Sequence, residues 1–228
     1  MKDTLFLDAG GVLVNPNWAR VAERLRAHGV AAVAAALASA DPLARRELDR
    51  PELLRTAGDR AAGWLYFELV LAHAGIPLSA ETAAAFLELR RYHDRYNLWE
   101  SVPDEVPGAL RRLREMGLKL AVVSNANGTV RALFERVGLR PLVDLVLDSH
   151  EEGVEKPDPR FFERALSRMG ARPETTVHVG DLYEADVRGA RAAGIEAVLL
   201  DRAGLYPDAD CPRVASLDAL ADWLRDRG

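Results

Sequence analysis

Four short stretches of the sequence bring together residue types that can do chemistry: aspartates, a serine hydroxyl and a lysine. They are FLDAGGVLV (residues 6–14), VVSNANG (122–128), GVEKPDPRFF (153–162) and HVGDLYEAD (178–186). Carboxylates can act as nucleophiles or bind hard cations, and an ammonium group can offset their charge. Taken one at a time, each stretch also has a plain structural explanation: a turn aspartate, a helix cap, a solvated loop lysine or an Asx turn.

Each stretch lies at or near the end of a short apolar run, which is typical of a buried strand. We expect strands at Thr4–Leu7, residues 118–124, Leu145–Leu147, Thr176–Val179 and Ala197–Leu200. The helical stretches between them end at glycines, which readily terminate helices. This alternation predicts an α/β fold with a doubly wound parallel sheet. The four stretches would then meet at the carboxyl edge of that sheet, where such folds place their chemistry.

Residues 15–98 interrupt this alternation. Their apolar side chains recur at helical spacings, and Gly29, Pro42, Pro51 and the segment Gly75-Ile76-Pro77 punctuate them. Ser79 with Thr82 could cap the last long helix. We therefore predict a core formed by residues 1–14 and 99–228, with an all-helical domain, residues 15–98, inserted after the first strand.

Composition excludes several classes of function. The chain has 228 residues, with 30 Lys+Arg against 35 Asp+Glu and a net charge of −5, so neither nucleic acid nor a membrane is an expected partner. Cys211 is the only cysteine, which fits a reducing cytoplasm. Asp3 and Asp8 interrupt the apolar stretch that a signal peptide needs, and Val30–Ala40 is too short to span a bilayer. We expect a cytoplasmic monomer or homodimer.

The order and the residues of the four stretches resemble the motifs of the haloacid dehalogenase-like (HAD) superfamily, in its phosphatase-like branch with a helical cap. The likeness runs from Phe6 to Leu200. Its most specific parts are Lys156-Pro157-Asp158-Pro159 and the pair Gly180-Asp181 with Asp186 five residues on. The resemblance implies a Rossmann-like HAD core, a cap that closes over the substrate, and hydrolysis of a small phosphorylated metabolite.

The resemblance also implies roles for four residues in nucleophilic attack and metal binding. Asp8 would be the nucleophile and would form an aspartyl-phosphate. Mg²⁺ would take oxygen ligands from the Asp8 carboxylate, the backbone carbonyl of Gly10 and the Asp181 carboxylate. Asp186 would hold the metal's waters or act as a further ligand.

Three more residues are implied to handle the phosphoryl group. The Ser124 hydroxyl and the backbone amides around Asn125 would bind its oxygens. Lys156 would offset the negative charge between Asp8 and the transferring group, and would keep Asp8 ionised.

The sequence departs from the family pattern at Gly10. HAD phosphatases usually carry a second aspartate there, which protonates the leaving oxygen and then activates water. General acid–base catalysis contributes roughly 10²–10⁴-fold, so we expect slow turnover or a preference for good leaving groups. His28, His73 and His93 are candidate donors in the insertion, and nothing in the sequence selects one. His178, inside an apolar run, reads as a buried, hydrogen-bonded core histidine.

Two other functions remain open at this point. A 2-haloacid dehalogenase would share Ser124-Asn125, Lys156 and the missing second aspartate. Metal-free dehalogenation, however, gives no reason to keep Asp181 and Asp186 facing Asp8. The second alternative is a binding or regulatory protein with weak turnover, although such a protein would not need an intact nucleophile.

Overall fold

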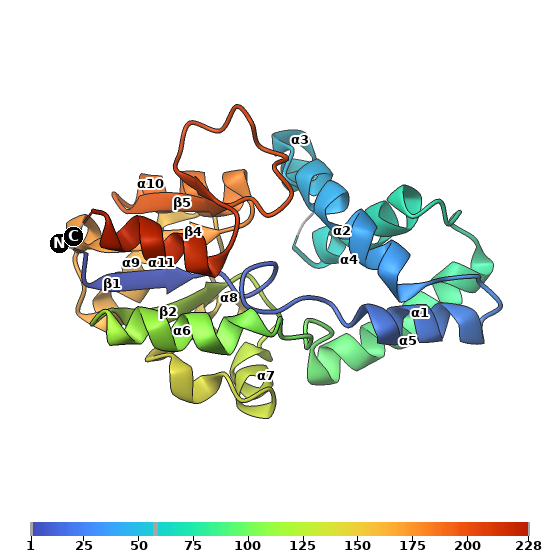
Figure 1. Ribbon diagram of the computed structural model, residues 1–228. Helices are drawn as coiled ribbons and strands as arrows, with labels where there is room; N and C mark the ends of the chain where they lie inside the picture. The colour runs from blue at the N-terminus through green and yellow to red at the C-terminus, as the bar shows by residue number, and fades with distance from the viewer. Residues whose placement is uncertain (1, 57–58, 228) are drawn as a thin grey trace. The chain divides into compact units, whose positions relative to one another are not determined.

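The computed structural model describes residues 2–56 and 59–227 (Figure 1). The chain forms two compact units, Met1–Asn15 with Trp99–Gly228, and Pro16–Leu98. Asn15, which we expected in the insertion, belongs to the first unit. Its amide donates to the Ser101 carbonyl at 2.8 Å, and the Ser101 amide donates back at 3.0 Å.

The first unit is built on one sheet of six parallel strands in the order β3-β2-β1-β4-β5-β6. The strands are β1 (Thr4–Leu7), β2 (Lys119–Ser124), β3 (Leu145–Asp148), β4 (Thr176–Gly180), β5 (Glu196–Leu200) and β6 (Arg213–Val214). The first five lie where the apolar runs predicted them, whereas the short edge strand β6 has no such run.

Helices cover both faces of the sheet, which confirms the doubly wound α/β fold. One face packs against α6 (Glu105–Glu115), α7 (Val130–Arg136) and α11 (Leu217–Arg225). The other packs against α9 (Pro159–Met169), the π-helical turn η3 (Tyr183–Arg188) and α10 (Gly189–Ala192). Successive strand residues point to opposite faces, so Val177 and Val179 belong to the first core and Phe6 and Ala197 to the second.

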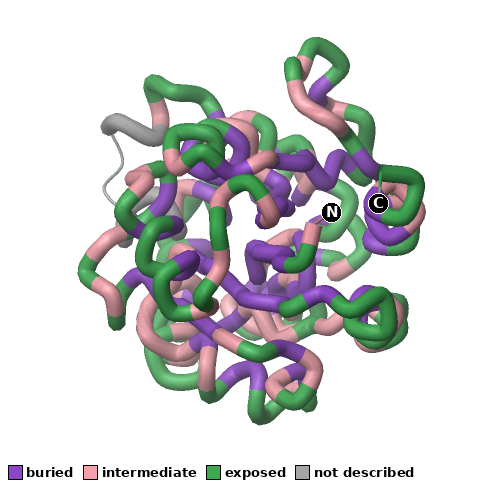
Figure 2. Tube along the Cα trace, turned by 90° about the vertical axis from the view of Figure 1, so that its left-hand side faces the viewer, coloured by how far each residue is buried: buried purple, intermediate pink, exposed green. Residues whose placement is uncertain are grey.

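Short elements complete this unit: α8 (Ser149–Glu152) and the 3₁₀ turns η1 (Arg140–Leu142) and η2 (Pro173–Thr175). The strands are buried along nearly their whole length. Figure 2 colours the buried residues of the chain purple. Such burial on both faces explains why the strands read as continuous apolar runs rather than alternating ones.

The second unit is all-helical in its described part. It contains α1 (Trp18–Ala27), α2 (Ala34–Leu48), α3 (Pro51–Thr56), α4 (Asp59–His73) and α5 (Ala80–Tyr96). A capping box starts α5: the Ser79 hydroxyl accepts from the Thr82 amide and the Thr82 hydroxyl accepts from the Ser79 amide. The prediction that Ser79 and Thr82 cap the start of this helix is therefore confirmed.

Pro42, which we expected to punctuate the helical stretches of the insertion, instead lies inside α2. A proline inside a helix removes one backbone hydrogen bond and disfavours the helix. Three apolar residues of α2, Leu37, Ala40 and Ala44, are nevertheless buried, and α2 packs closely against α4. Burial of this face outweighs the local preference.

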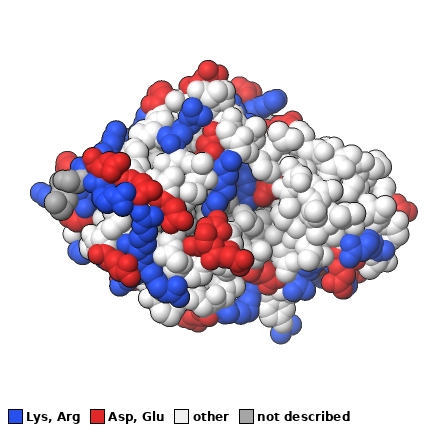
Figure 3. Space-filling model, in the orientation of Figure 1, with Lys and Arg blue, Asp and Glu red and all other residues white. Residues whose placement is uncertain are grey.

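Two surface properties bear on the expected partners. Within the described residues, no helix is long and apolar enough to cross a membrane. On the face drawn in Figure 3, acidic and basic side chains are interspersed rather than gathered into a basic patch.

Candidate active site

Two neighbouring strands carry an aspartate just beyond their carboxyl ends. Asp8 follows β1 and Asp181 follows β4, and these strands pair with Leu7 opposite Val179. The Asp8 amide donates to the Val179 carbonyl at 2.9 Å. Because β1 and β4 lie where the strand order changes direction, this is the point at which open α/β sheets bind ligands.

A third carboxylate comes from the π-helical turn η3. The Asp186 side chain lies directly over Gly180, where an added Cβ would stand 2.0 Å from the Asp186 Cγ. Only a glycine leaves room for this approach. One carboxylate oxygen from each of Asp8, Asp181 and Asp186 lies within 4.8 Å of the others. The sequence prediction that these three groups lie together is confirmed.

Lys156 joins two of these carboxylates. Its Nζ donates to Asp8 Oδ1 at 2.6 Å and to Asp186 Oδ1 at 2.7 Å. The Lys156 side chain is only 3% exposed, so both contacts are shielded from water. A buried ammonium is stable only when it is paired and hydrogen-bonded, and these two contacts meet that condition.

The pKa values of the three groups move in different directions. Burial, the largest influence, disfavours the Lys156 ammonium, but Asp186 and Asp8 together outweigh it and raise the pKa of Lys156. Burial also disfavours the Asp186 carboxylate, yet Lys156 and His178 hold the pKa of Asp186 well below its usual range. For Asp8, burial and the nearby Asp186 charge exceed the effect of Lys156, so the pKa of Asp8 is raised. Lys156 therefore favours the Asp8 carboxylate without fully offsetting its burial.

Strand β2, which lies beside β1, ends at Ser124, and Asn125 follows it. The Asn125 side chain clamps the Lys156 backbone: its Nδ2 donates to the Lys156 carbonyl at 2.9 Å, and its Oδ1 accepts from the Lys156 amide at 2.7 Å. No described residue hydrogen-bonds the Ser124 hydroxyl. The Asn125 side chain thus positions Lys156, a role that the sequence did not indicate, while the Ser124 hydroxyl is available to a ligand.

Asp148 supports the same loop and was missed by sequence reasoning. It ends β3, and its Oδ2 accepts from the amides of Gly128 at 2.9 Å and Val130 at 3.3 Å. Its Oδ1 accepts from the His150 amide at 3.0 Å. An aspartate at the end of an apolar run was the available signal, since it has the same form as Asp8 at the end of β1.

His178 is buried, as expected, and its hydrogen-bond partner belongs to the site. Its Nε2 lies 2.9 Å from Asp186 Oδ1, the oxygen that also accepts from Lys156. Its spacing from Asp186, eight residues along the chain, gave no hint of this contact.

Gly10 stands where a second aspartate would be expected, and Trp99 packs against it. A Cβ added to Gly10 would lie 3.3 Å from both Cδ1 and Nε1 of the Trp99 indole, and 4.0 Å from Asp8 Oδ2. These indole contacts are tighter than ordinary van der Waals separations. The space beside Asp8 that a side chain at position 10 would use is therefore bounded by an aromatic ring.

The residues present fit a divalent cation. Three carboxylates against one ammonium leave two negative charges when all are ionised, confined to a buried site. Hard oxygen donors of this kind are the ligands that Mg²⁺ prefers. No amide of the described residues donates to the Gly10 carbonyl, which leaves that oxygen available as a further ligand beside Asp8.

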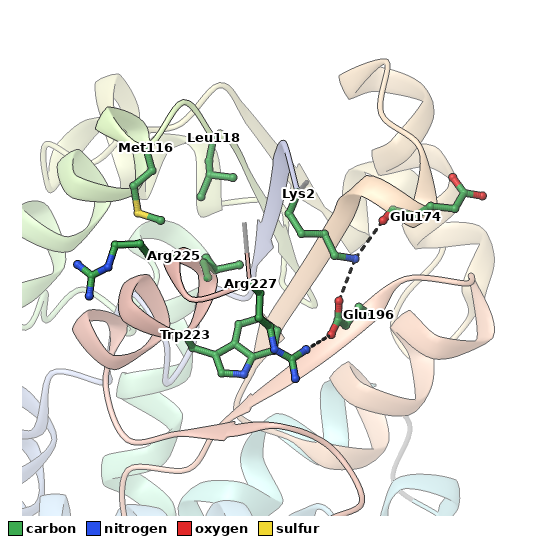
Figure 4. Close-up of a pocket in the computed structure, with 9 residues that line it drawn as sticks. Lys2, Met116, Leu118, Glu174, Glu196, Trp223, Arg225 and Arg227 are labelled. Carbon is green, nitrogen blue, oxygen red and sulfur yellow. Dashed lines mark hydrogen bonds and ion pairs between the residues drawn. The ribbon is translucent and has the colours of Figure 1, made fainter.

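A hollow of about 590 Å³ lies at the opposite, amino-terminal edge of the sheet (Figure 4). Three of its charged groups pair with one another: Lys2 with Glu196 at 2.9 Å, and Arg227 with the same carboxylate at 2.9 Å. None of the residues near Asp8 lines it, so this hollow is separate from the aspartate cluster.

Fold and site together define an α/β enzyme whose centre is an aspartate cluster at the carboxyl edge of a parallel sheet. The chain belongs to the haloacid dehalogenase-like hydrolase family, which it matches over residues 2–194. The family resemblance drawn from the four stretches, and the expectation of a hydrolase, are therefore confirmed.

Individual relatives agree with this membership. Over 205 residues the chain is 34% identical to haloacid dehalogenase-like hydrolase domain-containing protein 3 of Bos taurus, covering 88% of this chain and 79% of the relative. It is 38% identical to ribulose-1,5-bisphosphate 5-phosphatase of Halopiger xanaduensis, covering 67% of this chain and 64% of the relative. YfnB of Bacillus subtilis, solved bound to magnesium, shares the fold with a TM-score of 0.73 at 20% identity, covering 98% of each chain.

Proposed function

We propose that this protein is a Mg²⁺-dependent phosphatase that hydrolyses a small phosphorylated metabolite through an aspartyl-phosphate on Asp8. One observation carries the proposal: Lys156 Nζ lies 2.6 Å from Asp8 Oδ1, and the Asp8, Asp181 and Asp186 carboxylates gather within 4.8 Å. The relatives named as phosphatases support a phosphate ester as the substrate.

In the first step, the Asp8 carboxylate attacks phosphorus and the bond from phosphorus to the leaving oxygen breaks. The Ser124 hydroxyl and the backbone amide of Asn125 would donate to the phosphoryl oxygens, as donors aimed at developing charge do. Lys156, already paired with Asp8, would attract the same oxygens. Asp8 and Ser124 are held by buried backbone at the ends of the adjacent strands β1 and β2, which limits their movement during the reaction.

In the second step, water attacks the phosphorus of the aspartyl-phosphate, which releases inorganic phosphate and restores the Asp8 carboxylate. Mg²⁺, held by Asp8, the Gly10 carbonyl and Asp181, would supply Lewis-acid stabilisation of the phosphoryl oxygens. Asp186 accepts three hydrogen bonds from the protein, so we assign it to positioning Lys156 and to the outer part of the metal site.

With glycine at position 10, the side-chain acid that usually protonates the leaving oxygen is missing. The leaving oxygen therefore takes its proton from solvent. We infer that the enzyme favours substrates whose leaving groups are acidic enough to depart unprotonated. Trp99 strengthens this inference, because its indole ring bounds the space in which a replacement side chain at Gly10 would stand.

The decisive test is the initial rate on p-nitrophenyl phosphate with Mg²⁺, with EDTA, and for Asp8→Asn. We expect turnover that requires both the metal and Asp8, since the amide cannot form the acyl phosphate. The rate should also fall from p-nitrophenyl and acetyl phosphate to sugar phosphates. A rate that did not depend on the pKa of the leaving group would contradict the role assigned to Gly10.

Two alternatives have distinct outcomes in the same assays. A 2-haloacid dehalogenase would release halide in the presence of EDTA and leave phosphate esters intact. A binding or regulatory protein would bind Mg²⁺ by calorimetry without turnover. The three clustered carboxylates favour the phosphatase over the metal-free dehalogenase, because they concentrate negative charge that a cation relieves. The intact nucleophile Asp8 favours it over a binding protein, which would not need one.

We further propose that the helical unit Pro16–Leu98 is the cap and carries the substrate-selecting side chains. Size-exclusion chromatography with light scattering would distinguish a monomer from a homodimer. Fractionation of the producing cells would test the predicted cytoplasmic location.

A further inference from the structure

His178 is a buried polar residue for which the proposed phosphatase mechanism has no role. It lies on β4, is 0% exposed, and points into the apolar core that also holds Phe6 and Ala197. The Phe162 ring packs edge-on against it at 4.9 Å between centroids. An apolar side chain would suit these surroundings better than an imidazole does.

Among the described residues, the His178 ring makes one polar contact, and this contact explains why a histidine stands here. Nε2 lies 2.9 Å from Asp186 Oδ1, whereas Nδ1 is buried without a hydrogen-bond partner. Leaving a buried nitrogen unpaired is unfavourable, so the contact with Asp186 must stabilise the protein enough to offset it. An ionised carboxylate only accepts hydrogen bonds; Nε2 therefore carries the proton and donates.

This donor completes the fixation of Asp186. Oδ1 accepts from His178 and Lys156, and Oδ2 accepts from the Leu182 amide at 3.0 Å. Because Gly180 carries no side chain, the carboxylate rests against the β4 backbone. Lys156 then bridges the fixed Asp186 to Asp8, at 2.7 Å and 2.6 Å.

We propose that His178 is a positioning residue of the active site: through Asp186 it sets the place of the Lys156 ammonium, and thereby the orientation of Asp8. The inference rests on the proposed function only for its kinetic consequence. The chain of contacts itself is a property of the folded protein and can be measured without turnover.

Two substitutions separate the hydrogen bond from the volume of the ring. His178→Phe keeps a ring against Phe162 and removes the donor, and His178→Gln keeps an N–H at a similar reach. Val177→Ala is the matched control, because Val177 is equally buried on β4 but faces the opposite core. It weakens the sheet without touching Asp186.

The chain has only three lysines, Lys2, Lys119 and Lys156, which makes the ammonium groups easy to follow by nuclear magnetic resonance in ¹⁵N-lysine-labelled protein. Lys156 is the buried one of the three. In His178→Phe we expect its Nζ resonance to shift and its ammonium protons to exchange faster, with Lys2 and Lys119 unchanged as internal references. His178→Gln should restore the parent spectrum in part, and Val177→Ala should leave it unchanged.

Kinetics on p-nitrophenyl phosphate give the second readout. A displacement of about 1 Å in a catalytic group lowers rates by about 10²-fold, so His178→Phe should lower kcat by about ten- to a hundredfold, with KM nearly unchanged and partial rescue in His178→Gln. An unchanged Lys156 resonance in His178→Phe would overturn the proposal whether or not the protein is a phosphatase. A shifted resonance without any phosphatase activity in the parent would overturn the proposed function instead.

Discussion

Substituting Gly180 by alanine probes the closest packing in the site. A Cβ at this position would lie 2.0 Å from Cγ, 2.2 Å from Oδ2 and 2.3 Å from Cβ of Asp186. Carbon atoms in contact are normally separated by about 3.5–4.0 Å. The Asp186 carboxylate must therefore move by about 1.5 Å or more, because the strand backbone on the other side cannot give way.

Such a movement breaks the contacts that hold Asp186. Its hydrogen bonds to Lys156 at 2.7 Å, His178 at 2.9 Å and Leu182 at 3.0 Å cannot all survive it. Separating one member of a buried ion pair lowers stability by about 3–5 kcal/mol. We expect Gly180→Ala to lower the free energy of unfolding by this amount, which corresponds to a fall of ~6–20 °C in Tm.

Urea unfolding and thermal melting measure the loss, and Gly108→Ala is the matched control. Gly108 lies in α6, and a Cβ there would meet nothing within 4 Å. Glycine inside a helix is less stable than alanine by about 0.5–1 kcal/mol, so Gly108→Ala should be slightly more stable than the parent. If Gly180→Ala matched the parent in stability and in the Lys156 resonance, the tight contact with Asp186 would not be what fixes that carboxylate.

Three further predictions concern other parts of the chain. Gly10→Asp alone should raise kcat on alkyl phosphates less than tenfold. Gly10→Asp combined with Trp99→Leu should approach the roughly 10²-fold increase that a general acid gives. Equal increases in kcat for the two variants would show that the indole does not restrict a side chain at position 10. Burial lowers the pKa of His93, whose Nδ1 accepts a hydrogen bond from the Leu98 amide. The folded protein therefore binds a proton at His93 less well than the unfolded chain does. The stability that results is present above about pH 6.5 and is lost as pH falls below that value. Urea unfolding at pH 7.5 and 5.5 should show this loss, and His93→Asn should reduce it. Ser79→Ala should lower the free energy of unfolding by about 1 kcal/mol through the lost cap, and an unchanged urea midpoint would contradict that cap's contribution.

The sheet could be predicted because its strands are short and apolar and give way to polar residues at their carboxyl ends. Thr4–Leu7 was placed to the residue, since Asp3 and Asp8 bound it on both sides. The edge strand β6 has only two residues and too few apolar side chains to form a pattern. Pro42 misled the prediction because its local preference was outweighed by packing between α2 and α4, which depends on residues far apart in the sequence.

The residues of the site could be predicted where a motif contains the reactive or metal-binding side chain itself, as with Asp8, Lys156 and the Gly180-Asp181 pair. The supporting contacts could not. The backbone amides around Asn125 were assigned to the phosphoryl group, but nothing in the sequence indicated that its side chain clamps the Lys156 backbone. His178 was read as a core residue, and it is one; its contact with Asp186 arises only because the chain turns back over Gly180. Contacts between side chains that are far apart in the chain cannot be predicted from the spacing of residues in a single sequence.

The packing of Trp99 against Gly10 also constrains how this enzyme can evolve. Codons for glycine and aspartate can differ by a single base, so an aspartate at position 10 is within easy mutational reach. Its side chain would meet an indole that a bare Cβ already approaches to 3.3 Å. Most of the benefit of the new carboxylate therefore depends on a second substitution at Trp99, and Trp99 replaced first would leave a gap with no catalytic gain. Such dependence of one substitution on another would slow the gain of an effective acid at position 10, even though the residue itself is one mutation away.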